Sequence, residues 1–208
     1  MSKYHDDASV ASHPGGVVLS DEKLKRFHPK LYTRWSRFLG RLPLWFPVDR
    51  FGLSHRYRDI VDEHVRLGDS RAALVMSIDP LLVAAYTDEL DCVAILRFDP
   101  WVREAYNLNV GDRLLTVNTY TPLRAAPVAS DLTFGSQQYG RYSDFWPIIA
   151  EFIAADLQPI RNRKSRIDKA EWQRTRDLAE PILAAPRVPF RYGAPLMSFA
   201  PIAPAASA

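Results

Sequence analysis

The segment that decides the fold is 72-AALVMSIDPLLVAAYTDELDCVAILRF-98. It contains three apolar runs of strand length, residues 72–78, 81–86 and 92–98, which are rich in Val, Leu, Ile, Tyr and Phe. The separators Asp79-Pro80 and 87–91 carry turn-forming residues, so we expect successive runs to pair as antiparallel neighbours. Because the runs are nearly continuous rather than alternating, both faces of the sheet should be covered.

The chain that follows extends this sheet. A short helix is predicted from Pro100 to Asn107, and residues 113–120 form a fourth apolar run. The long loop 121–142 has room for a short strand from Leu132 to Phe134. The segment 108-LNVGDRLLTVN-118 is similar to the Gly-Asp-x-Leu/Ile-x-x-Val-Asn stretch of PDZ domains. This resemblance implies a turn that leads into a strand, and we carry no binding residue across.

Helices are predicted on both sides of the strands. The stretch from Ser54 to Leu67 has the period of a helix with one buried face, and Gly68 is expected to end it in a left-handed conformation. A later helix is predicted to begin at Ser143 or Asp144, with Phe145, Ile149, Phe152 and Ile153 on its buried side.

A last helix is predicted from Asp168 to Glu180, where Asp168 and Glu171 have the spacing of a capping box. The combined patterns favour an α+β fold with an antiparallel sheet of four to five strands, about residues 71–134, covered by flanking helices. We expect a single domain over 19–184, a mobile tail over 1–18 and a Pro/Ala-rich tail over 185–208.

Composition places the chain in the class of ordinary globular proteins. It has 208 residues, 47% of them hydrophobic and 25% charged, which suits one domain with extensions. The single cysteine, Cys92, excludes an intramolecular disulfide and favours a reducing compartment. We find no apolar core of a signal peptide and no apolar run of the ~18 to 20 residues needed to cross a bilayer. The expected location is therefore the cytoplasm.

Charge is distributed unevenly along the chain. Residues 1–60 carry 11 Lys/Arg and 6 Asp/Glu, residues 61–150 carry 7 and 12, and residues 151–208 carry 9 and 6. The last third includes a basic linker, Arg161-Asn162-Arg163-Lys164. The basic flanks could fold back on the acidic middle, or they could meet an anionic partner.

The region 21–42 combines basic and apolar residues at helical spacing. Ser20 or Asp21 is expected to cap its first helix, and Pro29 should divide it into two shorter ones. Each cation directly precedes an apolar position, so basic and apolar stripes would run side by side. This pattern is typical of a helix that binds an anionic membrane surface, a nucleic acid or a protein groove, and also of a solvated surface helix. Candidate binding residues here and just beyond are Lys30, Arg34, Arg37, Arg41, Trp45 and Phe46.

Other candidate groups have a simpler structural interpretation. Acidic residues cluster at the predicted strand ends, where paired carboxylates could act as acid and base, although turns favour Asp for local hydrogen bonding. These residues are Asp79, Asp88, Glu89, Asp91 and Asp99. Cys92 is expected to be a buried structural thiol, and His64 a hydrogen-bonded core residue. No motif for a metal, a nucleotide or another cofactor is found, so none is predicted.

The functional expectation is a non-enzymatic protein-interaction or regulatory module, with another protein as partner. The first alternative is binding of anionic lipid or nucleic acid through the basic amphipathic helix 21–42. The second alternative is an enzyme that uses the carboxylates at the strand ends.

Overall fold

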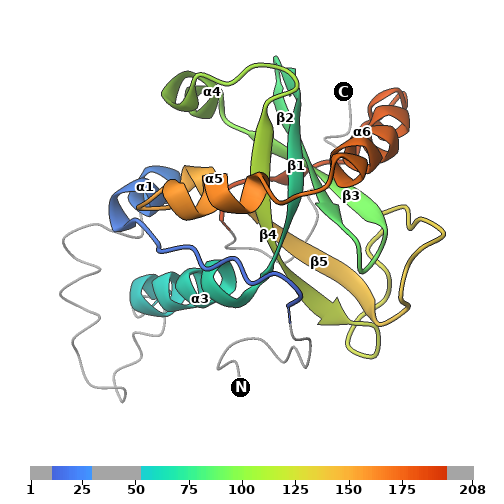
Figure 1. The fold of residues 1–208 in the computed structure, drawn as a ribbon, viewed down its shortest axis with the longest axis horizontal. Helices are drawn as coiled ribbons and strands as arrows, with labels where there is room; N and C mark the ends of the chain where they lie inside the picture. The colour runs from blue at the N-terminus through green and yellow to red at the C-terminus, as the bar shows by residue number, and fades with distance from the viewer. Residues whose placement is uncertain (1–10, 30–52, 196–208) are drawn as a thin grey trace, which may run out of the picture.

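The computed structural model describes residues 11–29 and 53–195, and it confirms the α+β class (Figure 1). Within these residues, none of the helices has the length and apolar character that a membrane span requires. The elements, in chain order, are α1 (Asp21–Phe27), α3 (Leu53–Leu67), β1 (Asp69–Ile78), β2 (Leu81–Thr87), β3 (Cys92–Phe98), α4 (Pro100–Tyr106), β4 (Arg113–Pro122), β5 (Tyr142–Ile149), the 3-10 turn η2 (Ala150–Phe152), α5 (Gln158–Lys164), α6 (Lys169–Leu183) and β6 (Arg191–Tyr192).

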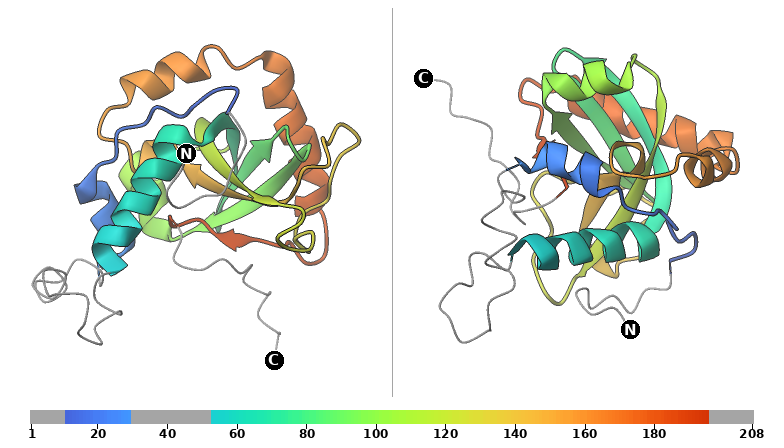
Figure 2. Two further views of the ribbon diagram at one scale, coloured as in Figure 1. Left: turned by 90° about the horizontal axis from the view of Figure 1, so that it is seen from below. Right: turned by 90° about the vertical axis from the view of Figure 1, so that its left-hand side faces the viewer.

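One curled sheet forms the centre of the molecule (Figure 2). Its strand order is β5-β4-β1-β2-β3-β6, and all neighbours are antiparallel except β3 and β6, which are parallel. The β1-β2-β3 meander predicted from residues 72–98 is confirmed, with Ala73 opposite Ala85 and Ala85 opposite Ala94. The sheet is therefore mixed and has six strands, where the sequence predicts four to five antiparallel ones.

Both faces of the central strands are buried, as their continuous apolar sequences predict. On the outer face, α6 covers β2 and β3, and α3 and α5 pack near β1 and β4. The inner face is covered differently from the prediction, because the curl turns the sheet on itself and its own side chains fill the interior. Val75, Val83, Leu96 and Leu114 from four strands meet there around Phe152 of η2.

The prediction of a helix that begins at Ser143 or Asp144 is wrong, because this segment forms strand β5. Residues 142–149 pair with β4, with Trp146 opposite Thr119 and Ile149 opposite Thr116. The misleading signal was the spacing of Phe145 and Ile149: four residues is one helical turn, but it is also an even number, so both side chains lie on one face of a strand. The edge position of β5 also accommodates Pro147, which has no N–H to donate.

Two smaller predictions also need correction. The structure has no strand from Leu132 to Phe134, and Leu132 instead packs against Tyr120 and Phe145. Gly68 follows α3 as predicted, but its φ is not positive. Glycine is needed there because a Cβ would lie 2.7 Å from the His64 carbonyl oxygen, inside van der Waals contact.

Several local predictions are confirmed. α3 and β4 have nearly the predicted bounds, and Gly111 adopts a φ of +88° in the turn before β4. The Asp168 side chain accepts a hydrogen bond from Ala170 N at the start of α6. α1 is capped by Ser20 and ends at Phe27, before Pro29.

Parts of both stretches interpreted as tails pack against the domain. Gly16 and Val17 donate backbone hydrogen bonds to the last turn of α3, Gly15 donates to the Gly68 carbonyl oxygen, and Val17 is buried. β6, from the stretch 185–208, pairs with β3 at Leu96 and Arg97.

Candidate functional site

The six candidate binding residues lie outside the described part of the chain. Lys30, Arg34, Arg37, Arg41, Trp45 and Phe46 all fall between residues 29 and 53. Of the basic amphipathic region, the structure describes α1, where Leu24 is buried and Lys25 and Arg26 are exposed.

The acidic residues at strand ends do not converge. Asp79 and Asp99 lie at one end of the β2-β3 hairpin, and both are exposed. Asp88, Glu89 and Asp91 lie at the other end. The seven residues of β2 separate the two sets by roughly 20 Å, too far for carboxylates to act as one acid–base pair.

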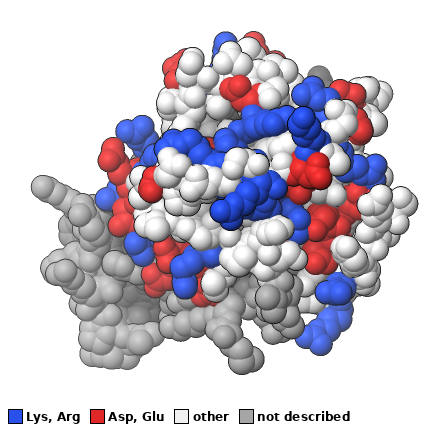
Figure 3. Space-filling view, viewed as in Figure 1, with Lys and Arg blue, Asp and Glu red and all other residues white. Residues whose placement is uncertain are grey.

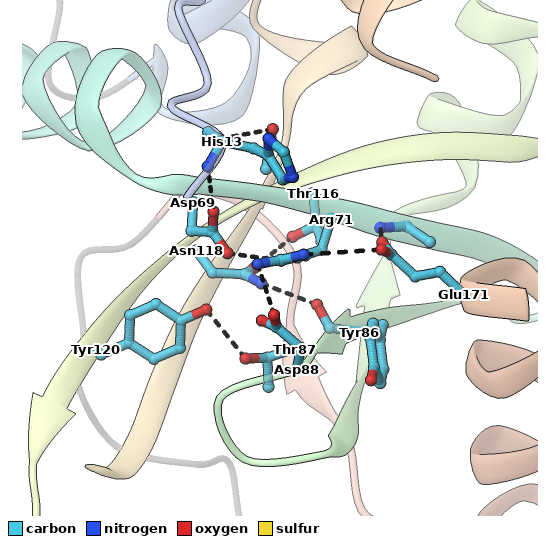
Figure 4. A network of polar contacts seen from close by, with 12 residues as sticks. His13, Asp69, Arg71, Tyr86, Thr87, Asp88, Thr116, Asn118, Tyr120 and Glu171 are labelled. Carbon is cyan, nitrogen blue, oxygen red and sulfur yellow. Dashed lines mark hydrogen bonds and ion pairs between the residues drawn. The ribbon is translucent and has the colours of Figure 1, made fainter. Parts of the chain in front are cut away.

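Of these three residues, Asp88 belongs to a buried charge network centred on Arg71 of β1 (Figure 4). Arg71 is 7% exposed, and its Nε lies 2.6 Å from Asp69 Oδ2. Its Nη2 lies 2.6 Å from Asp88 Oδ2 at the end of β2, and its Nη1 lies 3.8 Å from Glu171 Oε2 on α6. Burial opposes the charge on Arg71, but Asp69 and Asp88 outweigh it and raise its pKa.

This network fills a gap between diverging strands. The ladder between β1 and β2 begins at Ala73, so Ala72 N has no partner on β2 and donates to Glu171 Oε1 instead, at 2.7 Å. The capping-box role expected for Glu171 is therefore replaced by a bond to the sheet. On the inner side, Asn118 Nδ2 of β4 reaches past β1 to the Tyr86 carbonyl oxygen, at 2.8 Å.

Burial raises the pKa values of Asp88 and Glu171, although Arg71 lowers both. A guanidinium shared by several carboxylates offsets the hydration that they lose on burial. Removing it would leave their buried negative charge uncompensated. We interpret the network as a joint between β1, β2 and α6. A similar joint is formed by Arg174 of α6, whose Nε and Nη2 donate to the Asp91 carboxylate at 3.0 and 2.6 Å.

A second group of charges lies on the outer surface around Glu151 of η2, where Lys23 of α1 and Lys164 of α5 both contact this residue. The chain before α1 pairs with the chain before α5: Leu19 bridges Ala154, and Ala155 N donates to the Val18 carbonyl oxygen. These contacts bring basic segments from both ends of the sequence together. The linker predicted at 161–164 is the last turn of helix α5.

Lysine and arginine gather across this surface, as Figure 3 shows. We define the basic face as Lys23, Arg113, Arg161, Arg163, Lys164 and Arg166. Glu151 lies beneath it, only 9% exposed: Lys164 Nζ is 2.8 Å from its carboxylate, and Lys23 Nζ donates to its backbone carbonyl. Arg113 lies over the Trp172 ring, 5.0 Å from the centroid.

Burial is the largest influence on two cations of the basic face. It lowers the pKa of Arg163, and the repulsion of Arg71 and Arg166 adds to it against the attraction of Glu171 and Asp69. The pKa of Lys23 is likewise lowered by burial and by Arg26, in spite of Glu151. Arg161 and Arg166 are exposed, and neither forms an ion pair with any described residue. Their charge is directed at the solvent.

The sequence pattern identified the basic run 161–164, but not the basic residues that lie near it in space. Nothing in the sequence pairs α5 with α1, because more than 130 positions separate Lys23 from Arg161 and the contacts that join the two segments, at residues 18–20 and 153–155, form only in the folded chain. His64 and Cys92 are buried as predicted, and His64 Nε2 lies 2.8 Å from the Val117 carbonyl oxygen.

Comparisons with known proteins identify no matching family model, no matching curated protein and no matching solved structure.

Proposed function

We propose that this protein is a non-enzymatic interaction module that binds an anionic membrane surface through its basic face. The observation that supports this is the gathering of cations from α1, β4 and α5 on one surface, where the carboxylate that pairs with Lys164, that of Glu151, is buried. Such a face attracts anions, and the attraction falls as salt screens it.

The size of the electrostatic effect indicates that a further contribution is needed. A cation near an anionic leaflet contributes about 1 kcal/mol, so the more exposed cations of this face would contribute roughly 3 to 4 kcal/mol together. Binding of that strength corresponds to a dissociation constant near 1 mM.

The sequence that directly follows α1 favours a membrane over a nucleic acid. Residues 30–46 contain Lys30, Arg34, Arg37 and Arg41 and no carboxylate, interleaved with Trp and Phe. Basic residues would approach lipid headgroups while aromatic side chains such as Trp45 and Phe46 enter the interface. Nucleic acid would use the cations alone or stack bases on the aromatic rings.

Vesicle co-sedimentation tests the proposal. The full chain should bind vesicles of phosphatidylcholine with phosphatidylserine, bind pure phosphatidylcholine much less, and dissociate as salt rises. The double variant Arg161→Glu/Arg166→Glu should bind several-fold more weakly. The matched control is Arg103→Glu/Arg187→Glu, which makes the same charge change at exposed positions on α4 and beyond α6.

The segment 30–46 is tested by Arg34→Glu/Arg37→Glu and by Trp45→Ala, which should each reduce vesicle binding. Equal loss in the control variant would show an effect of net charge alone and overturn the role of the basic face. Binding to duplex DNA in fluorescence anisotropy without binding to vesicles would replace the membrane with nucleic acid as the partner.

A further inference from the structure

An apolar groove lies on the surface between α6 and the start of β3. It has a volume of about 390 Å³, near the lower end of ligand-binding pockets. Its walls are mostly apolar and come from three parts of the chain: Val93 of β3, Leu178, Pro181 and Ile182 of α6, and Ala185 and Pro189 of the segment before β6. Thr133 and Asp177 complete the lining.

The groove lies where the ladder between β3 and β6 has not yet begun. The two strands pair only at Leu96 and Arg97 of β3, three residues beyond Val93, and Pro189 comes just before β6. β6 therefore does not pair with this end of β3, which is covered from one side by α6. The groove is a product of the sheet's topology, since a longer β6 would continue along β3 toward it.

Thr133 and Asp177 are the polar residues of its lining. Asp177 is exposed and is the one charged side chain in the lining. Pro181 stands inside α6, four residues later, and has no N–H. The carbonyl oxygen of Asp177 is thus deprived of its usual helical donor. A carboxylate and a carbonyl acceptor on one groove residue fit a ligand that carries a cationic donor beside an apolar group.

We propose that this groove is a second binding site, which accepts a peptide segment of a partner protein with an aliphatic or aromatic side chain next to Lys or Arg. The apolar side chain enters between Leu178, Ile182 and Pro189, and the cation pairs with Asp177. The groove is a separate site from the basic face. It selects a cationic peptide, which the basic face would repel, so this inference does not depend on the proposed membrane binding. The pairing of an apolar anchor with a charged rim is common at protein interfaces.

Selection of a random-peptide phage library on the full chain tests the site, followed by fluorescence anisotropy with a synthesised peptide from the selection. Selected peptides should share an apolar residue beside Lys or Arg. Asp177→Asn should weaken the synthesised peptide roughly two- to fivefold, the range of an exposed ion pair. Glu180→Gln is the matched control, since it removes one carboxylate from an exposed position of α6 outside the groove lining.

Two further variants separate this site from general charge effects. Selection on Asp177→Lys should recover peptides without the Lys or Arg preference. Pro181→Ala restores an N–H for the Asp177 carbonyl, so it should weaken peptide binding while raising thermal stability. Failure to enrich any peptide, enrichment without cations, or equal losses in Asp177→Asn and Glu180→Gln would each overturn the inference. None of these results bears on vesicle binding by Arg161 and Arg166.

Discussion

Arg191 of β6 donates from Nη2 to Asp144 Oδ1 of β5 across 2.7 Å, and so joins the two opposite edges of the sheet. The same guanidinium donates to Asp131 and to the Phe145 carbonyl oxygen, each at 2.6 Å. Its side chain is 8% exposed. Burial opposes its charge, but Asp131 and Asp144 raise its pKa. The curl is thus closed by one side chain rather than by a backbone ladder.

Arg191→Met should destabilise the fold by about 3 to 5 kcal/mol, because it leaves two buried carboxylates without their cation. Chemical denaturation with urea measures the free energy of unfolding. Arg187→Met, at an exposed position four residues earlier, should change it by less than about 0.5 kcal/mol. A similar small change in both variants would contradict the role assigned to Arg191.

Glu89→Gln should stabilise the protein at neutral pH. Burial, followed by the charge of Asp88, raises the pKa of Glu89, and its Oε2 has no hydrogen-bond partner among the described residues. Below the ordinary value of 4.5 the carboxyl is protonated in both the folded and the unfolded chain. As the pH rises through the raised pKa, the folded chain must hold an unfavourable charge, and stability is lost relative to the glutamine variant.

The measurement is the free energy of unfolding of both proteins from acid to neutral pH. The advantage of Glu89→Gln should be small at acid pH and grow toward neutrality. Glu180→Gln, at an exposed position, should show no such trend. An advantage that is constant with pH would mean that charge is not its cause.

Cys92 should not react with a thiol reagent while the protein is folded. It is 0% exposed, and burial raises the pKa of its thiol, so little thiolate is available. Ellman's reagent should detect no thiol in the native chain at neutral pH and one thiol after unfolding in urea. Rapid labelling of the native protein would place Cys92 in an accessible site and contradict its structural role.

The strands of the meander were predictable because their signal is local. Continuous apolar runs separated by Asp79-Pro80 and by residues 87–91 leave a hairpin as the simplest solution, and the register Leu81 opposite Phe98 agrees with it. β5 was not predictable in the same way. Phe145 and Ile149 suit a helix or a strand equally, and pairing with Thr116 and Tyr120, more than twenty positions away, selects the strand.

The candidate sites also differ in how much of each could be recognised from local sequence. Arg161, Arg163 and Lys164 were recognisable as a basic run, but their union with Lys23 depends on the bridge between Leu19 and Ala154. The groove at Asp177 had no sequence signal. It arises from where β6 begins along β3, and a strand of two residues leaves almost no periodic pattern.

The sequence alone determined the α+β class, the antiparallel meander, the burial of Cys92 and His64 and the basic character of the flanks, because each depends on neighbours within one element or one turn. Only the tertiary structure decided that the sheet curls and covers its own inner face, that Arg71 and Arg191 join its diverging strands and open edges, and that the two basic segments share a surface. Those features depend on contacts between residues far apart in the chain, and such contacts are fixed by the packing of the whole domain.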